Sequence, residues 1–117
     1  MLSKDLVAAS SKPLILSLLS KGESYGYEII KSIQELSDEE IVWKEGMLYP
    51  VLKKLCDNGL IESEWKNVDG RKRTYYKIIK KGLESLNEEK LQWMVVNKTK
   101  ICFMNIMLIK RNKVRIV

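Results

Sequence analysis

The sequence contains no histidine and only two cysteines among its 117 residues. Without histidine, the chain lacks the commonest metal ligand of proteins and their commonest general base at neutral pH. Cys56 and Cys102 each lie in an apolar helical pattern, which is typical of small buried side chains rather than of a disulfide or a metal pair. No spacing indicates a nucleophile beside a base or a glycine loop around a phosphate. We therefore expect a protein that is not an enzyme and that holds no metal and no cofactor.

Long apolar runs are missing as well. The longest apolar stretch, Ile101 to Ile109, is broken by Asn105 and is shorter than the roughly 18 residues that indicate a membrane helix. The N-terminal segment has charged residues on both sides of its short apolar run 7–9, so it contains no signal-peptide core. The sequence predicts one cytoplasmic domain with a core of modest size.

Positive charge is unevenly distributed along the chain. Residues 1–65 carry seven Lys and Arg against eleven Asp and Glu, whereas residues 66–81 carry seven basic residues against one acidic residue. Residues 98–117 have six basic side chains and no acidic one. The basic block 66–81, which lies between acidic segments, is a feature that would face a polyanion, although a solvated hairpin would also account for it.

The first half of the chain has two helical patterns. Pro13 follows Ser11 by two residues within the apolar segment from Leu2 to Ser20, and this spacing predicts the start or a bend of a first helix. Ser24 is a candidate cap for a second helix from Tyr25 to about Leu36. The apolar face of this second helix is expected to hold Ile29, Ile30, Ile33 and Leu36.

A third helix is predicted from about Gly46 to Asn58. Its apolar residues recur at i, i+3, i+4, i+7 and i+8 and are Leu48, Val51, Leu52, Leu55 and Cys56. Pro50 is expected in its first turn, where a missing N–H costs nothing. The exposed face is expected to hold Gly46, Pro50, Lys53 and Asp57.

The apolar period then changes from helical to two, which predicts a β-hairpin. Ile61, Ser63 and Trp65 alternate with charged residues, and a similar alternation returns around Tyr76 after an Asp-Gly pair. Trp65 and Tyr76 are predicted to lie in the core of this hairpin. From about Lys80 a helical pattern resumes that is apolar on more than one face, so it requires a partner surface, most simply the same helix of a second copy.

This order predicts a mainly α fold with a small β-hairpin, namely a winged helix-turn-helix followed by a long dimerisation helix. The domain predictions are residues 1–79 for DNA binding, 80–109 for the C-terminal dimerisation helix and 110–117 for a basic tail without an assigned place in the fold. In such a fold the third helix enters the major groove, and the hairpin, or wing, lies along phosphates or a minor groove.

Specific motifs accompany this order over about residues 13–96. They are Ile15-Leu16-Ser17-Leu18-Leu19, Tyr25-Gly26-Tyr27-Glu28-Ile29, Gly46-Met47-Leu48-Tyr49-Pro50-Val51-Leu52, Gly59-Leu60-Ile61-Glu62-Ser63, and Gly70-Arg71 with Tyr75-Tyr76. Together they resemble the PadR-like transcriptional regulators. The resemblance implies a cytoplasmic dimeric repressor, which in many members is released from DNA by a small aromatic or apolar effector. The short length is similar to that of the smaller subfamily with a single C-terminal helix.

Two positions depart from the pattern of the family. Met47 stands where the family usually has Thr or Ser, so a hydroxyl contact to DNA is lost there. Ile79 stands where the family often has a Thr cap, and its side chain cannot accept a hydrogen bond from the start of the last helix.

The predicted DNA contacts come from the start of the second helix, from the third helix and from the wing. They are Tyr25, Lys44, Met47, Tyr49, Pro50, Lys53, Lys54, Arg71, Lys72 and Arg73. Each group also has an ordinary alternative: Tyr49 and Pro50 in packing, the two third-helix lysines on a solvated face, and the wing charges in solubility. The resulting function is sequence-specific binding of double-stranded DNA by a homodimer on an inverted-repeat operator. The alternative is a winged-helix protein-interaction module without specific DNA binding.

An effector site is predicted between two long helices. If these helices cross near Trp93, the indoles together with Leu6, Ala9 and Asn97 would line a flat cavity for a small aromatic effector. The ordinary alternative places Trp93 in a helical core.

Overall fold

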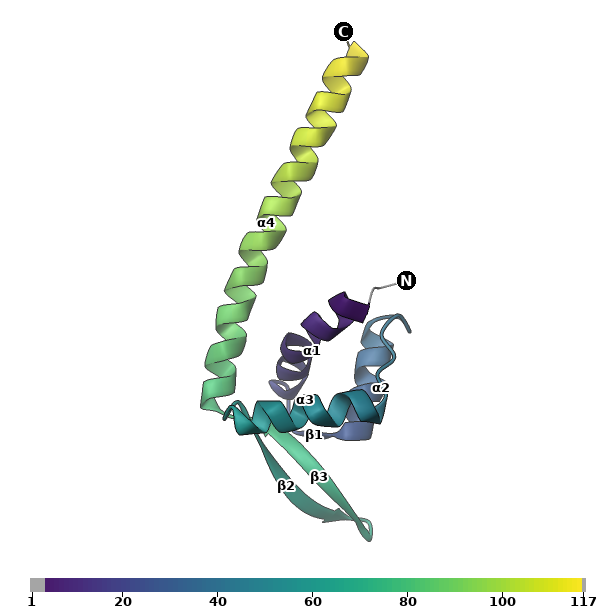
Figure 1. The fold of residues 1–117 in the computed structure, drawn as a ribbon, viewed down its shortest axis with the longest axis vertical. Coiled ribbons are helices and arrows are strands. Elements are labelled where there is room, and N and C mark those ends of the chain that lie inside the picture. Colours follow the sequence, from purple (N-terminus) through teal and green to yellow (C-terminus); the bar gives the residue numbers. More distant parts are fainter. Residues whose placement is uncertain (1–3, 117) are drawn as a thin grey trace. The chain divides into compact units, whose positions relative to one another are not determined.

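A computed structural model of the protein describes the backbone of residues 4–116 and the side chains of residues 9–92 and 94–99. The elements follow the order α1 (Lys4–Leu19), β1 (Ser24–Tyr25), α2 (Gly26–Leu36), α3 (Glu45–Asp57), β2 (Ile61–Val68), β3 (Arg71–Ile78) and α4 (Lys80–Ile116) (Figure 1). The chain divides into two compact units, Met1–Leu86 and Asn87–Val117. The predicted class, mainly helical with a small sheet, is confirmed.

The first unit has one apolar core made by α1, α2, α3 and the base of the sheet. Each helix contributes residues spaced three or four apart, so that they share one face. The buried apolar residues are Ile15, Leu16, Leu19, Ile29, Ile33, Trp43, Leu48, Leu52, Leu55, Leu60, Ile61, Tyr76 and Leu86. At the end of α2, Leu36 lines a hollow together with Ile33 but is itself 69% exposed. Trp43, in the connection between α2 and α3, is buried although no periodic pattern singled it out.

Both prolines lie inside helices, which rules out the start of α1 as the role of Pro13, leaves the predicted bend open, and places Pro50 beyond the predicted first turn. Pro13 lies well inside α1 and does not start it, and the expected cap Ser11 is a buried helical residue. Pro50 is the sixth residue of α3 rather than a residue of its first turn. At that position the missing N–H leaves the carbonyl of Gly46 without its helical partner, and this loss is tolerated where the backbone is exposed to water.

The start of α2 also differs from the prediction. Tyr25 is the residue before the first helical residue, with extended backbone angles, and its side chain makes no capping hydrogen bond. Ser24, the predicted cap, belongs instead to β1, and its hydroxyl donates a hydrogen bond of 2.6 Å to Oε1 of Glu28.

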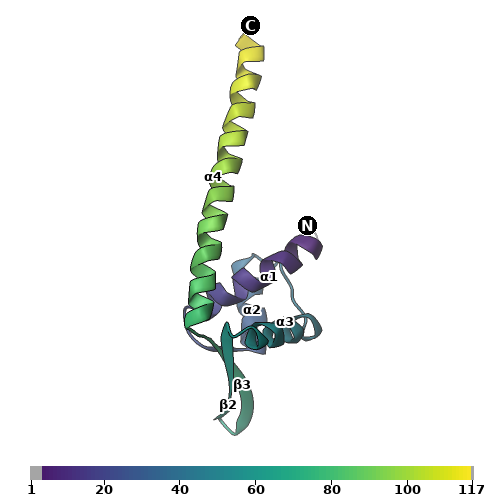
Figure 2. The ribbon, with the colours of Figure 1, turned by 60° about the vertical axis from the view of Figure 1, so that its left-hand side comes forward.

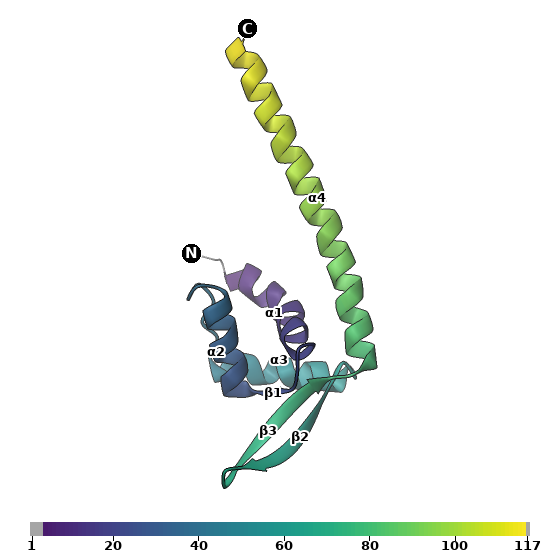
Figure 3. The same ribbon diagram turned by 180° about the vertical axis from the view of Figure 1, so that it is seen from behind.

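The sheet has three antiparallel strands in the order β1-β3-β2. The hairpin of β2 and β3 is paired from Ile61 with Ile78 out to Val68 with Arg71. Asp69 and Gly70 connect the strands with φ angles of 52° and 77°, the two positive values of a type I′ turn, whose twist matches that of the strands. β1 adds a third strand beside β3 (Figure 3). The sequence did not predict β1, because two residues are too short to show alternation.

The outer part of the hairpin extends beyond the apolar core that covers its base. The register places Trp65 on the same face as Ile61 and Tyr76, as the alternation predicted. The hairpin projects past the helices (Figure 2), however, and Trp65 is 71% exposed whereas Tyr76 is only 9% exposed. The prediction of a core position is therefore confirmed for Tyr76 and wrong for Trp65.

Helix α4 begins at Lys80, as predicted, and continues to Ile116 without a break at 109. In its first turn, Gly82 packs so closely on the carbonyl of Leu60 that a Cβ atom would overlap the carbonyl oxygen. In the second unit, Leu91, Met94 and Val95 are each about two-thirds exposed. Over the described part of the chain, no helix is long and apolar enough to cross a membrane.

Candidate nucleic-acid interface

An open hollow joins the start of α2, the exposed side of α3 and the wing, β2–β3. Its lining combines four aromatic residues with three basic ones: Tyr25, Gly26, Tyr27, Tyr49, Trp65, Arg71, Lys72, Arg73 and Thr74. Five of the ten predicted DNA contacts, namely Tyr25, Tyr49 and the three wing residues, thus line one concave surface. Tyr27 and Trp65 were not among the predicted contacts. Trp65 directly precedes the basic block, but alternation assigned it to the core, and no local pattern connects Tyr27 with that block.

Close packing of α2 and α3 fixes the position of Tyr49 at this surface. A Cβ atom on Gly26 would lie 2.5 Å from the Tyr49 hydroxyl oxygen, so only glycine allows the ring to lie there. Tyr49 nevertheless remains 43% exposed. Tyr49 thus packs closely on α2 and still offers part of its surface to a ligand.

Aromatic rings hold Arg73 beside the start of α2. The guanidinium carbon of Arg73 lies 4.4 Å from the centroid of the Tyr25 ring, and Tyr25 meets Tyr75 edge to face at 5.4 Å. Lys66 Nζ lies 5.3 Å from the Tyr75 centroid and also pairs with Glu23. Cation–π contacts of this kind orient a cation without neutralising it. Arg73 is therefore held in place without forming an ion pair among the described residues.

The basic residues of the wing fall into two groups, those that form an ion pair with a carboxylate and those that do not. Lys66 and Lys77 lie opposite carboxylates, the latter with Nζ 4.0 Å from Glu62 Oε2. Hydrogen bonding to Glu23 raises the pKa of Lys66, which keeps this side chain charged at neutral pH. Arg71 and Lys72, in contrast, are exposed and form no ion pair among the described residues. The charges near the tip of the wing are thus the ones available to an external anion.

The remaining predicted contacts lie on or just before α3. Lys44 precedes its first residue, and Pro50, Lys53 and Lys54 are exposed along the helix. The expected exposed face is confirmed, since Gly46, Pro50, Lys53 and Asp57 are all open to solvent. Met47 differs from these, because it is half-buried and packs against the core.

Two titratable groups beneath the interface stay neutral at physiological pH. Burial raises the pKa of the Tyr76 phenol, with Tyr49 as a second cause. Burial and then the neighbouring Asp57 raise the pKa of the Cys56 thiol, while a hydrogen bond with Ser63 opposes this rise. Cys56 is half-buried with a free thiol, and the side chain of Cys102 lies outside the described residues.

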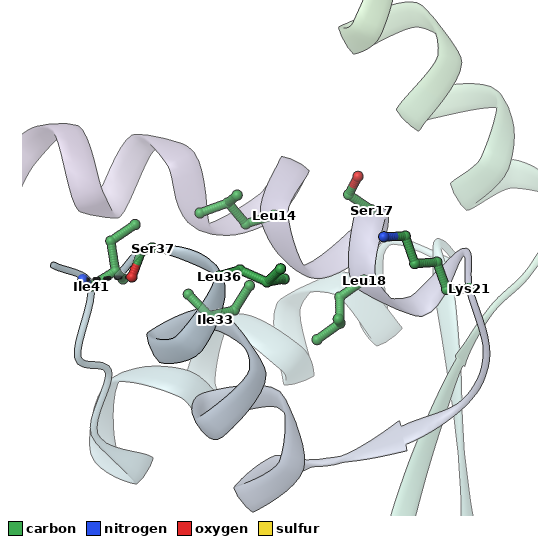
Figure 4. Close-up of a pocket in the computed structure, with 8 residues that line it drawn as sticks. All are labelled: Leu14, Ser17, Leu18, Lys21, Ile33, Leu36, Ser37 and Ile41. Atoms are coloured by element: carbon green, nitrogen blue, oxygen red, sulfur yellow. Dashed lines mark hydrogen bonds between the residues drawn. The ribbon is translucent and has the colours of Figure 1, made fainter. Parts of the chain in front are cut away.

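The predicted effector residues are not brought together by the described part of the structure. Ala9 and Asn97 are exposed and belong to different units, while the side chains of Leu6 and Trp93 lie outside the described residues. A separate apolar hollow of about 160 Å³ lies between α1 and α2 (Figure 4). It is lined by Leu14, Ser17, Leu18, Lys21, Ile33, Leu36, Ser37 and Ile41, none of which was predicted to bind an effector.

A model of the transcriptional regulator PadR-like family matches residues 15–88. The chain belongs to the PadR-like family. This membership confirms the resemblance found in the sequence, and it makes the chain a transcriptional regulator rather than an enzyme.

Solved structures and curated relatives agree with this assignment. A transcriptional regulator from Clostridium thermocellum is 36% identical with a TM-score of 0.76, over 85% of this chain and 94% of that one. A PadR family regulator from Clostridium difficile R20291 is 33% identical with a TM-score of 0.71, over 81% and 98%. The transcriptional regulator YqjI of Escherichia coli is 30% identical over 75% of this chain and 37% of its own length.

Proposed function

We propose that this PadR-like regulator binds double-stranded DNA, with α3 in the major groove and the wing along the adjacent phosphates. The observation that carries the proposal is the hollow shared by α3 and the wing, where exposed tyrosines adjoin Arg71, Lys72 and Arg73. Arginine and lysine supply the phosphate contacts that dominate affinity, and side chains of a helix in the groove read the bases. The site for this binding comprises the ten residues predicted from the sequence.

The regulator is proposed to act as a homodimer that represses transcription in the cytoplasm. Leu91, Met94 and Val95 leave an apolar stripe of α4 exposed, as a helix that pairs with a second copy would. A two-fold dimer would read two half-sites about one helical turn apart, so the operator is expected to be an inverted repeat.

The test is a titration of DNA from just upstream of the regulator's own gene, and of random DNA, at several salt concentrations. We expect a steep salt dependence and tighter binding to the upstream DNA. Replacing Arg71, Lys72 and Arg73 together with alanine should weaken binding to both DNAs and reduce the salt slope by about one per lost contact. Lys72→Ala alone should reduce the slope by about one, and its matched control is Lys77→Ala, because Lys77 is on the same strand but lies opposite Glu62. A triple variant with unchanged affinity would favour the protein-interaction alternative.

A small aromatic or apolar effector is proposed to lower DNA affinity by favouring a dimer with wrongly spaced recognition helices. Leu6, Ala9, Trp93 and Asn97 remain the proposed site, with the two copies of Trp93 stacking on a planar ligand. Titrating planar aromatic compounds into the wild type and Trp93→Ala, with tryptophan fluorescence as the signal, tests this. Equal ligand affinity in the two proteins would show that Trp93 does not contact the effector and has an ordinary packing role.

A further inference from the structure

Trp65 is the most exposed large apolar residue among the described side chains, at 71%. It lies on the wing, on the strand face that carries Ile61 and Tyr76 at the base and Asn67 and Lys72 further out. Tyr76 at the base is buried, so the face passes from core to solvent along the hairpin. An indole offers a large apolar surface, which remains in contact with water in the free protein.

The surroundings of Trp65 combine basic side chains with other aromatic rings. It borders two hollows, one shared with α3 and one confined to the wing and lined by Trp65, Lys66, Asn67 and Lys72. Lys72 lines both of them. A protein partner with an apolar groove would have to bury the three wing charges beside these rings, whereas a DNA backbone offers deoxyribose carbons between phosphates. The arrangement therefore fits a nucleic-acid strand better than it fits a protein surface.

From this arrangement we infer that Trp65 is the apolar contact of the wing with DNA. Its indole packs on deoxyribose at the edge of the minor groove, while Lys72 binds the neighbouring phosphate and Asn67 reaches the groove. Apolar side chains that accompany basic ones are a recurring feature of proteins that contact the minor groove. The inference rests on the proposed DNA binding and assigns to it a residue outside the ten predicted contacts.

Affinity measurements distinguish this role from that of the charged residues. Trp65→Ala should weaken DNA binding about fivefold, while Trp65→Phe, which keeps a ring, should lose less. Since no charge is removed, the salt slope should stay that of the wild type, whereas Lys72→Ala should reduce it by about one. Val68→Ala is the matched control, because Val68 is 39% exposed on the opposite face of the same hairpin.

A spectroscopic measurement reports on Trp65 directly in the full-length protein. With 5-fluorotryptophan incorporated, the fluorine resonance of Trp65 is the one missing from Trp65→Phe. We expect its large solvent isotope shift in free protein to fall when DNA is added, because the indole leaves water. A resonance that keeps its isotope shift in the DNA complex would overturn the inference, as would one that loses the shift on increasing protein concentration without DNA.

The outcomes separate this inference from the proposed function. If Trp65→Ala binds DNA as the wild type does while the triple wing variant binds poorly, the Trp65 contact is wrong and DNA binding by the wing stands. If neither variant loses affinity, the proposed function itself fails. If Val68→Ala loses as much affinity as Trp65→Ala, the loss comes from truncating any apolar side chain of the wing and not from an indole contact, and the inference is again overturned.

Discussion

Individual residues decide how closely the elements of the first unit approach one another. Gly26 admits the Tyr49 ring between α2 and α3, and Gly82 admits the Leu60 carbonyl at the start of α4. Gly46, in contrast, has open space where a Cβ atom would lie. Glycine is thus required by close packing at two positions and not at the third.

This difference predicts opposite effects of alanine at two helical positions. Gly82→Ala should lower the free energy of unfolding by about 2 kcal/mol, because the added Cβ meets the Leu60 carbonyl and lies 2.7 Å from Cγ1 of Ile78. Gly46→Ala should leave stability unchanged or raise it by up to about 1 kcal/mol, since alanine favours a helix. Urea unfolding of both variants measures this, and equal stability of Gly82→Ala and wild type would contradict the packing described for α4.

The thiol of Cys56 should react slowly at neutral pH. Its raised pKa means that less thiolate, the reactive form, exists at any given pH than for an ordinary thiol near 8.5. In a Cys102→Ser variant, the pH at which alkylation by iodoacetamide reaches half its maximal rate should lie above that of an ordinary thiol. When the protein is unfolded in urea, this pH should return to the ordinary value. A midpoint at or below that of glutathione would show that burial does not control this thiol.

At the scale of elements, the periodicity of apolar residues correctly predicted the position of α3 and the faces of the hairpin strands. The helical spacing of Leu48, Leu52 and Leu55 placed α3 to within one residue, and alternation around Trp65 and Tyr76 gave the correct strand face. What the pattern could not show was how far the core extends along that face. Trp65 was therefore assigned to the core, although the hairpin projects past the helices that would cover it.

In the candidate site, too, some features follow from local sequence, whereas others depend on contacts between segments far apart in the chain. The basic block and the exposed face of α3 could be read from the sequence, because both are contiguous or periodic. The stacking of Arg73 on Tyr25 could not, since it depends on β1 pairing with β3 over some fifty residues of chain. Tyr27 was missed for the same reason, as it reaches the hollow only because α2 begins beside the wing.

α3 and the wing should contribute differently to sequence preference. Lys53 is exposed on the face of α3 opposite Leu52 and Leu55, so Lys53→Ala should change the relative affinities for single base-pair variants of one operator. If Lys53 contacts guanine, the loss should be about 1–3 kcal/mol at one base pair. Lys72→Ala should instead weaken all variants alike, because a phosphate contact carries no base information. Anisotropy titrations over a set of operator variants measure both, and a uniform loss for Lys53→Ala would place this lysine on phosphate.

For the whole molecule, the first unit contains the buried apolar core, and no described residue of the second unit belongs to it. The residues of α1–α3 and the sheet bury a common core, whereas Leu91, Met94 and Val95 of α4 remain open. These three recur at i, i+3 and i+4 and form one stripe on the helix. A single chain therefore leaves apolar surface on the very segment that the sequence predicted to pair.

A charge within this stripe should separate the proposed dimer. Met94 is 66% exposed in the single chain, so Met94→Asp costs little before assembly and buries a carboxylate after it, which is strongly unfavourable. Sedimentation velocity at micromolar concentration should show a dimer for the wild type and a monomer for Met94→Asp. Gln92→Asp, which adds the same charge on a different side of the helix, should stay dimeric. Because a monomer reads one half-site, Met94→Asp should bind an inverted repeat no more tightly than a single half-site. If the wild type itself sediments as a stable monomer, the expectation of an inverted-repeat operator loses its basis.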